Sequence, residues 1–565
     1  MQKEANALRN KVAFETAKKM NTAQSYKDFI SMYPDAEEIK DAKWLYDFTL
    51  FNSMTKQNNL ETYEDFVKQF PKSPYRPQAE DSIFIFSTRK ESIEEYRAFI
   101  KKYPDNHNVK KTWEIIYSLS TLDFTPSAIQ NFLSDNPDFP DKEKVNSDLQ
   151  RAKINLYPII EEGKWGYIDS AGKIQVPCTY DWADEFSEGA AVVIREEKTG
   201  YINKAGNVII TFSYDEANSF HNGLAVVKKG NKSGLILKTG KQILPLEFED
   251  ISENEGDEKI ILALKEGVYK YFDVNGHLIT EGKFEKAGDF ISDRAYIVQK
   301  GEYGFINKKG EIIIPSIYYW AENFKPNGTA RIKLLDKYGM IDTTGKSLLQ
   351  CEYDRIDDFS EGIVLVVKNK KFGYADKKGN LIIPIKFDYS PEISEVRGFQ
   401  NGLAKVEQNK KRGLINKSGN MYVPCEYDDL RNFSEELCAV KRGGKWGYIE
   451  RSRKQKINFQ FDYAWDFNGD LARVKQKGKT GFINQKGEFI IPAIYDEATD
   501  FKNGISIAIS GGKKGALESS GKIIIPFEMD EITETHRGIL KLEKNGKSAY
   551  FNLALQKQIW AEAGF

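Results

Sequence analysis

One motif, Lys-Trp-Gly-Tyr-Ile-Asp at residues 164–169, recurs through the last three-quarters of the chain. Successive copies are almost always 34 residues apart, and the position of the motif's glycine falls at Gly166, Gly200, Gly234, Lys270, Gly304, Gly339, Gly373, Gly413, Gly447, Gly481, Gly515 and Ala549. Periods of 20–50 residues mark units that cannot bury an apolar face alone and must stack on their neighbours. The chain is therefore predicted to be a repeat array.

The interior of a unit predicts three short strands. Leu224–Val227 and Gly234–Leu237 are apolar runs joined by a tight turn, and a second glycine follows each anchor by six residues in a hairpin loop. Arg453 replaces that glycine once, so a strained hairpin is expected there. An apolar run ending in proline, an aromatic–Asp pair and a loop with a phenylalanine complete the unit. Each unit is predicted to be an antiparallel meander of three strands plus a loop anchored by aromatic residues.

These residues resemble the bacterial WG-repeat family, whose units read Lys-Trp-Gly-Tyr-Ile-Asp, Gly-Lys, Ile-Pro, Tyr-Asp and Phe-x-x-Gly-Leu-Ala-Val. The resemblance covers roughly residues 155–565 and implies a repeat scaffold often found in the cell envelope, without an activity. We predict an all-β array of about twelve units over residues 151–565. An open β-superhelix, or solenoid, is expected because twelve units exceed the 4–8 blades usual for one propeller. A β-propeller-like arrangement, as two propellers side by side, is the alternative.

Three places depart from the repeat. The unit around Lys270 lacks both the tryptophan and the glycine, and the last unit stops at Trp560 without its aromatic–Asp loop, as a terminal cap would. A step of 40 residues places extra turn-forming residues at Tyr389–Ser394, which indicates a surface-loop insertion. Any function specific to this chain is expected at Tyr389–Ser394, around Lys270, or along the lysine-rich turns.

Residues 1–150 follow a different pattern. Apolar residues at i, i+3, i+4 and i+7 precede a proline four times, as in Tyr26, Phe29, Ile30 and Tyr33 before Pro34. This spacing is one face of a helix that the proline ends, and the stretches that follow supply a partner helix. The segment resembles tetratricopeptide-like helical hairpins of envelope assembly lipoproteins. It either caps the β array or forms a dedicated peptide-binding groove.

The composition indicates a folded protein of two parts without a dominant charge. The 565 residues carry 82 Lys and Arg against 83 Asp and Glu, a net charge of −1. No overall field attracts the protein to nucleic acid or to a membrane, and no apolar run reaches the ~18–20 residues of a membrane span. No signal peptide opens the chain. We expect an envelope-associated protein, periplasmic or at the surface, if a signal segment was removed, and a cytoplasmic one if the chain is complete.

The residues that commonly perform chemistry fall into the repeat register. Cys178, Cys351 and Cys425 occupy one equivalent position, which predicts half-buried packing rather than a disulfide or metal site. The four histidines, His107, His221, His277 and His536, stand in linkers, loops or hairpins. Eight acids occupy one equivalent position of the repeat and are predicted to cap turns: Asp181, Asp215, Asp354, Asp388, Asp428, Asp462, Asp496 and Asp530. No catalytic, cofactor-binding or metal-binding residues are predicted, and the chain is not expected to be an enzyme.

Lysine-rich turns between the first two strands of many units form the candidate binding surface. Its residues are Lys228, Lys370, Lys371, Lys410, Lys411, Arg412, Lys441 and Arg442. Such lysines either keep sheet edges from aggregating or present a basic ridge to an anionic polymer or acidic protein. The leading functional prediction is a non-catalytic scaffold for protein–protein interaction in the bacterial envelope. The alternative is a module that binds glycan or cell wall, for which exposed Trp165 and Trp446 would provide the platform.

Overall fold

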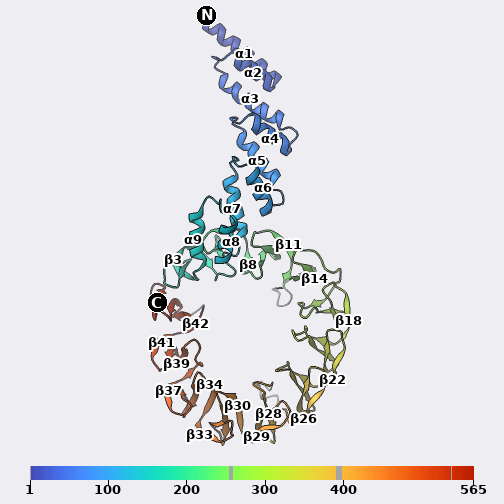
Figure 1. Ribbon diagram of the computed structural model, residues 1–565, viewed down its shortest axis with the longest axis vertical. Coiled ribbons are helices and arrows are strands. Elements are labelled where there is room, and N and C mark those ends of the chain that lie inside the picture. The colour runs from blue at the N-terminus through green and yellow to red at the C-terminus, as the bar shows by residue number, and fades with distance from the viewer. Residues whose placement is uncertain (1, 253–258, 390–397, 536–537) are drawn as a thin grey trace. The chain divides into compact units, whose positions relative to one another are not determined.

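The computed structural model describes residues 2–252, 259–389, 398–535 and 538–565. The chain divides into two compact units, Met1–Lys153 and Ile154–Phe565. The predicted boundary between residues 150 and 151 lies three residues before this division. The first unit is helical and the second consists of β-sheets (Figure 1). None of the helices in the described part of the chain has the length and apolar character needed to cross a membrane.

Residues 2–153 of the helical unit form a series of helices joined by short connections. Their bounds are α1 Gln2–Met20, α2 Ala23–Met32, α3 Ile39–Met54, α4 Leu60–Gln69, α5 Arg76–Ser87, α6 Ile93–Lys102, α7 Val109–Ser120, α8 Pro126–Asp135 and α9 Lys142–Ala152. The four helices predicted from the aromatic–proline pattern are α2, α4, α6 and α8.

Each of these four helices begins and ends through the same local chemistry. In α6 the side chain of Ser92 accepts the backbone N–H of Glu95, and the N–H of Tyr103 bonds to the carbonyl of Phe99. Tyr96 and Phe99 are buried, as the spacing predicts. The same pattern recurs in α2, α4 and α8. A hydroxyl or amide cap at the start and a proline after the C-cap residue therefore define the four helices.

The described residues of the second unit form twelve antiparallel sheets, which we call blades 1 to 12 in chain order. Blades 1 to 6 contain β1 Leu156–Glu161, β2 Lys164–Asp169, β3 Ile174–Tyr180; β4 Trp182–Ala183, β5 Ala190–Arg195, β6 Lys198–Asn203, β7 Val208–Tyr214; β8 Glu216–Ala217, β9 Leu224–Lys229, β10 Lys232–Leu237, β11 Gln242–Phe248; β12 Asp250–Ile251, β13 Ile260–Lys265, β14 Val268–Asp273; β15 Lys286–Ala287, β16 Ala295–Gln299, β17 Glu302–Ile306, β18 Ile312–Tyr318; β19 Trp320–Ala321, β20 Thr329–Leu334, β21 Lys337–Asp342 and β22 Ser347–Tyr353.

Blades 7 to 12 continue the same order. They contain β23 Arg355–Ile356, β24 Ile363–Lys368, β25 Lys371–Asp376, β26 Leu381–Asp388; β27 Leu403–Gln408, β28 Lys411–Asn416, β29 Met421–Tyr427; β30 Asp429–Ser434, β31 Leu437–Arg442, β32 Lys445–Glu450, β33 Gln455–Phe461; β34 Tyr463–Asn468, β35 Leu471–Gln476, β36 Lys479–Ile483, β37 Phe489–Tyr495; β38 Glu497–Ala498, β39 Ile505–Ser510, β40 Lys513–Glu518, β41 Ile523–Met529; β42 Glu531–Glu534, β43 Ile539–Lys544, β44 Lys547–Asn552 and β45 Lys557–Ala561.

The loop after the aromatic–Asp pair contributes a strand that the sequence analysis missed. In blade 2, β4 pairs with β5, so residues that follow the first unit's third strand complete the second unit's sheet. The phenylalanine of this loop packs back on its own unit: the rings of Phe186 and Tyr167 are 4.8 Å apart between centroids. Each loop therefore joins two consecutive blades, because its strand pairs forward while its aromatic ring packs backward.

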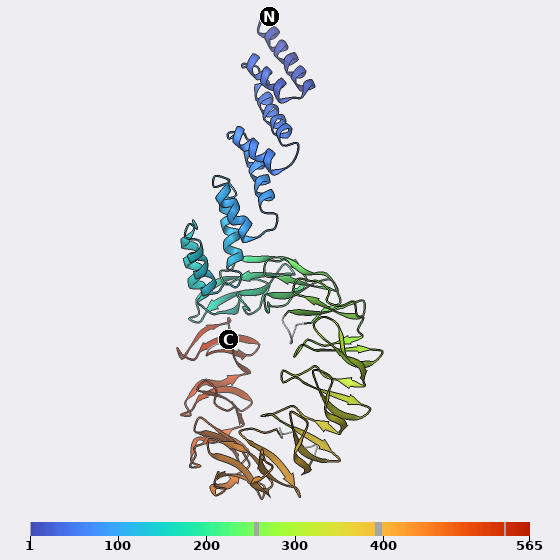
Figure 2. The ribbon, with the colours of Figure 1, turned by 45° about the vertical axis from the view of Figure 1, so that its right-hand side comes forward.

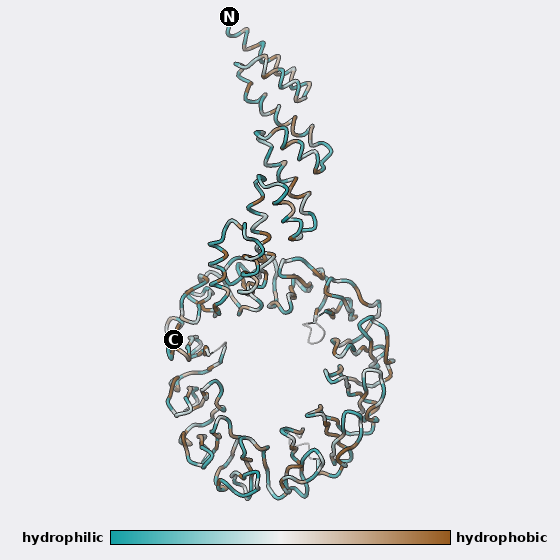
Figure 3. Tube along the Cα trace, viewed as in Figure 1, coloured by the Kyte–Doolittle hydropathy of each residue, from teal (hydrophilic) through white to brown (hydrophobic). Residues whose placement is uncertain are grey.

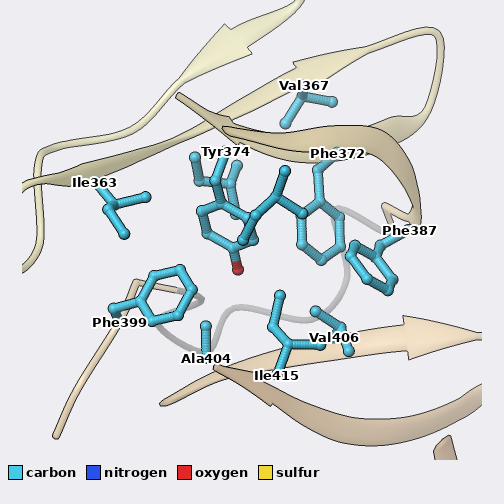
Figure 4. Close-up of a cluster of buried hydrophobic side chains, with 11 residues drawn as sticks. Ile363, Val367, Phe372, Tyr374, Phe387, Phe399, Ala404, Val406 and Ile415 are labelled. Carbon is cyan, nitrogen blue, oxygen red and sulfur yellow. The ribbon is translucent and has the colours of Figure 1, made fainter. Parts of the chain in front are cut away.

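The hydrophobic core lies between neighbouring blades. Figure 4 shows Tyr374 and Phe372 of blade 7 facing Val406 and Ile415 of blade 8, and all four side chains are buried. Hydrophobic and hydrophilic residues alternate along the chain in the blades around the ring (Figure 3). Since each blade buries both faces only when it has two neighbours, an array with free ends would leave two apolar faces in water.

The described blades close into one ring (Figures 1 and 2). Blade 12 meets blade 1, where the hydroxyl of Tyr550 donates to the carbonyl of Pro158 at 3.0 Å and the Asn552 amide donates to the carbonyl of Ser170 at 2.9 Å. Tyr157, Ile168 and Tyr550 belong to one buried cluster across this junction. The expected open superhelix is therefore wrong, and the β-propeller alternative is correct as one propeller rather than two. The end blades bury against each other the faces that free ends would expose, even though twelve blades exceed the usual 4–8.

The anchor glycine allows two strands to approach closely. A Cβ atom at Gly447 would lie 2.6 Å from the carbonyl oxygen of Ile457, because β33 bulges over this position. In blade 12 the anchor is alanine, and Ala549 pairs directly with Ala561 without a bulge there. The expected strain at Arg453 is also present, since its φ of 67° places an arginine in a left-handed conformation where ten of the other hairpins have glycine.

Candidate binding surfaces

A lysine and an aspartate of the same repeat form a turn cap on most blades. In blade 9, Lys445 Nζ lies 2.5 Å from Asp462 Oδ1, and Asp462 Oδ2 accepts the N–H of Gly478 in the first turn of blade 10. The same arrangement joins Lys164 to Asp181, Lys198 to Asp215, Lys337 to Asp354, Lys371 to Asp388, Lys411 to Asp428, Lys479 to Asp496 and Lys513 to Asp530. The lysine of the repeat motif is thus bound to the aspartate that caps the following blade.

The predicted role of the eight aspartates as turn caps is confirmed. Each accepts a backbone N–H from the next blade in addition to its lysine. The lysine hydrogen bond lowers the pKa of each carboxyl, and the backbone hydrogen bond contributes to the same shift. These acids are therefore ionised at neutral pH and already hold two partners.

Most of the predicted lysine surface pairs with acids of its own blade or of a neighbouring blade. Lys371 and Lys411 belong to turn caps, and Lys228 lies 3.3 Å from Glu216. The guanidinium of Arg412 contacts Asp429 at 2.6 Å, and that of Arg442 contacts Glu426 at 3.1 Å.

Three members of the predicted set differ in their exposure and backbone. Lys370 and Lys410 are exposed on turns with left-handed backbone, and Lys441 is half-buried on β31. The basic ridge stays a prediction, and in this structure opposite charges interrupt it.

The two tryptophans proposed as a sugar platform pack into the core. Trp446 is 2% exposed and belongs to the cluster between blades 9 and 10. Trp165 is half-buried against the cluster that joins blades 1 and 2. By the criterion of burial, both indoles stabilise the stack of blades and leave little aromatic surface for a ligand.

The cysteines are free thiols that fill space, as predicted. Cys178, Cys351 and Cys425 are half-buried and Cys438 is buried. Burial raises the pKa of the Cys425 thiol to about 11, so it stays protonated. Across the described ranges, no group of three or more His, Cys, Asp or Glu residues is arranged to hold a metal ion.

The three described histidines have different surroundings. His107 Nδ1 is 2.7 Å from Glu80 Oε2 in the helical unit, and His277 Nδ1 is 3.0 Å from Asp273 Oδ2 on a hairpin. His221 forms a bridge with Leu224 at the start of β9. His536 lies outside the described residues.

Two of the predicted departures from the repeat have different outcomes. Of the insertion at Tyr389–Ser394, only Tyr389 is described, and its hydroxyl accepts from Arg355 Nη1 at 3.1 Å. Around Lys270, β14 forms the described edge of a three-stranded sheet, and isolated bridges from Tyr269 to Phe284 and from Phe272 to Leu278 follow the path of the third strand. Loss of the anchor glycine thus accompanies loss of regular pairing with the third strand.

A groove of about 710 Å³ lies on the helical unit between α7 and the start of α9. Its floor is aromatic: the rings of Trp113 and Phe139 meet edge to face with centroids 5.9 Å apart. Its rim carries charges of both signs: Lys110 and Lys142 are basic, and Glu114 and Asp141 are acidic. Trp113 is half-buried and Phe139 is buried, so the indole is the accessible part of the floor.

A second pocket, of about 390 Å³, lies between blades 6 and 7, and sequence reasoning missed it. Trp320, Tyr338 and Arg331 come from blade 6, and Arg355 comes from β23 of blade 7. One signal was available: Tyr319 stands where nearly every other repeat has an acid. The pocket itself was not visible in the sequence, since its walls come from two repeats.

The structure thus defines a closed β-propeller built from Trp-Gly repeats, preceded by a helical unit. The model of the WG containing repeat matches residues 165–198, 200–232, 271–303, 303–338, 338–372, 372–411, 413–446, 446–479 and 481–513. These matches cover more than half of the chain, which therefore belongs to this family. No curated protein matches the sequence.

Solved structures resemble the chain only distantly. A eukaryotic initiation factor has 10% identity and a TM-score of 0.28, over 60% of this chain and 94% of that one. The extracellular domain of a putative one-component system from B. thetaiotaomicron has 9% identity and a TM-score of 0.19, over 72% and 71%. PorZ, a surface component of the type-IX secretion system of Porphyromonas gingivalis, has 11% identity and a TM-score of 0.19, over 71% of each chain. Similarities at this level do not indicate what the protein binds.

Proposed function

We propose that the protein is a non-catalytic scaffold of the bacterial cell envelope whose helical unit docks a protein partner. The groove floored by Trp113 carries this proposal, because an accessible indole in a concave site between helices is a typical anchor for a partner's side chain. The envelope is the compartment that the family resemblance implies. The propeller then serves as the scaffold domain to which the helical unit attaches the partner.

The surroundings of the groove indicate the kind of segment that fits. Its rim carries both lysines and acids, so a partner with an apolar anchor flanked by charges of both signs would find complementary positions. The helices resemble tetratricopeptide-like hairpins, in which consecutive hairpins present such grooves. A protein segment therefore fits this unit better than a polymer of one charge.

The acids of the propeller support a non-catalytic role. A general acid or base needs a carboxyl that is available to a substrate, whereas Asp462 and its seven equivalents each hold a lysine and a backbone N–H. Their pKa values are lowered rather than raised, which is the opposite of what a general acid requires at neutral pH.

The test is affinity capture with the full-length chain from extracts of the producing bacterium, comparing Trp113→Ala with Trp44→Ala. Trp44 is the matched control, since it is an exposed tryptophan of α3 that stacks on Phe48 outside the groove. We expect the wild type and Trp44→Ala to capture the same protein and Trp113→Ala to lose it while remaining folded. Equal capture by both variants would show that the groove is not the docking site.

A further inference from the structure

The pocket between blades 6 and 7 combines an aromatic wall with charged groups of both signs. The rings of Trp320 and Tyr338 meet at 80° with centroids 5.9 Å apart, and both side chains are half-buried. They come from β19 and β21 of one blade, and both residues pair with Lys333 of β20, which lies between these strands. Strand pairing therefore fixes the backbone on both sides of the aromatic wall.

The polar wall is held by hydrogen bonds within the protein. Arg331 makes a two-point contact with Glu322, at 2.9 and 2.5 Å, and donates to the carbonyl of Ile356 at 3.0 Å. Arg355 donates from Nε to Asp357 at 2.5 Å and from Nη1 to the hydroxyl of Tyr389. The side chain of Arg355 is 58% exposed, so part of its guanidinium faces solvent at the pocket.

The charges lining the pocket cancel. Two cations, Arg331 and Arg355, stand beside two carboxylates, Asp354 and Asp357. Neither sign of charge predominates, so the lining has no net electrostatic attraction for an anion or for a cation. A hydroxyl group both donates and accepts hydrogen bonds, so a guanidinium and a carboxylate held side by side suit it.

The surface beside the pocket also departs from the other blades. Tyr319 replaces the acid of the turn cap and is 69% exposed, and Leu335 is 86% exposed in the turn that the acid would cap. The φ of Leu335 is 53°, a left-handed conformation that is unfavourable for leucine. The N–H of Tyr319 bonds to the carbonyl of Lys333, which places these segments next to each other. Here the usual ionic cap has given way to accessible apolar and aromatic side chains.

We propose that this pocket binds one neutral sugar residue of a glycan. The C–H face of a pyranose ring packs against Trp320, and its hydroxyls bond to Arg355 and Asp357. The volume of about 390 Å³ falls within the range of small-ligand sites and accommodates such a ring. The site uses neither the lysine turns nor the tryptophans of the repeat motif, and it is independent of the partner proposed for the helical unit.

The test uses the full-length chain on an array that carries neutral oligosaccharides of glucose, galactose, mannose and N-acetylglucosamine beside sialylated and sulfated ones. We expect retention on at least one neutral glycan, whose affinity is then measured by calorimetry. Trp320→Ala should weaken it by about tenfold or more, as should Asp357→Asn, which preserves the shape of the side chain. Trp182→Ala is the matched control, because Trp182 holds the same repeat position in blade 2 and is exposed.

Each outcome of the array and of the variants either supports or overturns the proposal. Retention on sialylated or sulfated glycans alone, or on none, would overturn the proposal, as would an equal loss of affinity in Trp182→Ala and Trp320→Ala. Should Trp320→Ala prove unstable, Asp357→Asn decides, and unchanged affinity in that variant counts against the site. Trp113→Ala should bind the glycan normally, so a failure here leaves the protein-docking proposal unaffected.

Discussion

Replacement of an anchor glycine by alanine tests how the repeat motif works. At Gly447 the added Cβ would lie 2.6 Å from the Ile457 carbonyl oxygen and 2.9 Å from the carbonyl carbon of Asn458. Both atoms belong to the backbone of β33, so no side-chain rotation relieves the contact. An ordinary carbon contact is about 3.5–4.0 Å, and β33 must therefore move by roughly 1 Å.

The expected cost follows from two opposing effects. Forcing extra volume into a packed site costs about 1–3 kcal/mol. Alanine in a strand offsets roughly 0.5–1 kcal/mol of this, because the unfolded chain loses less freedom than with glycine. The net destabilisation of Gly447→Ala should be about 1–2 kcal/mol, concentrated where β32 pairs with β33.

Hydrogen exchange measured by mass spectrometry, together with urea unfolding, provides the assay. Amides of β32 and β33 should exchange faster in Gly447→Ala, whereas those of blades 3 to 6 should not change. Ala549→Gly is the control, since blade 12 has no bulge at this position and should lose no more than about 1 kcal/mol. Unchanged exchange at β33 in Gly447→Ala would refute the assignment of the anchor glycine to close strand approach.

Two further predictions concern pH and ring closure. The carboxyl pKa values of the eight turn-cap aspartates are lowered in the folded protein, so their stabilisation is complete above the unfolded pKa of about 3.9 and is lost as pH falls through the folded pKa values. The melting temperature of the propeller should therefore fall between about pH 5 and 3, and it should fall less in Lys445→Met. A constant melting temperature over this range would contradict the turn-cap role. The double variant Tyr550→Phe, Asn552→Ala removes two hydrogen bonds from blade 12 to blade 1, each worth about 1 kcal/mol. Hydrogen exchange should accelerate in β1 and β44 but not in β20 to β22, and exchange unchanged from the wild type in β1 and β44 would argue against a closed ring.

Local features of both units were predictable because they depend on neighbours in the sequence. The aromatic–proline pattern located α2, α4, α6 and α8, and the hairpin glycines and turn-cap aspartates are confirmed in their predicted roles. The loop strand β4 was missed because two residues carry no periodicity, and it exists only by pairing with β5 of the next repeat. The pocket at Trp320 was missed for the same reason, since its aromatic and polar walls come from different repeats.

The sequence by itself determined the repeating unit: its length, its three long strands, the hairpin glycines, and the aspartates that cap turns on most blades. Only the tertiary structure decided that the array closes. Closure depends on the rotation from one blade to the next and on contacts such as the hydrogen bond from Tyr550 to Pro158. These two residues are 392 positions apart in the sequence. No local pattern encodes such a contact, because its energy arises when the two end blades bury their remaining apolar faces against each other.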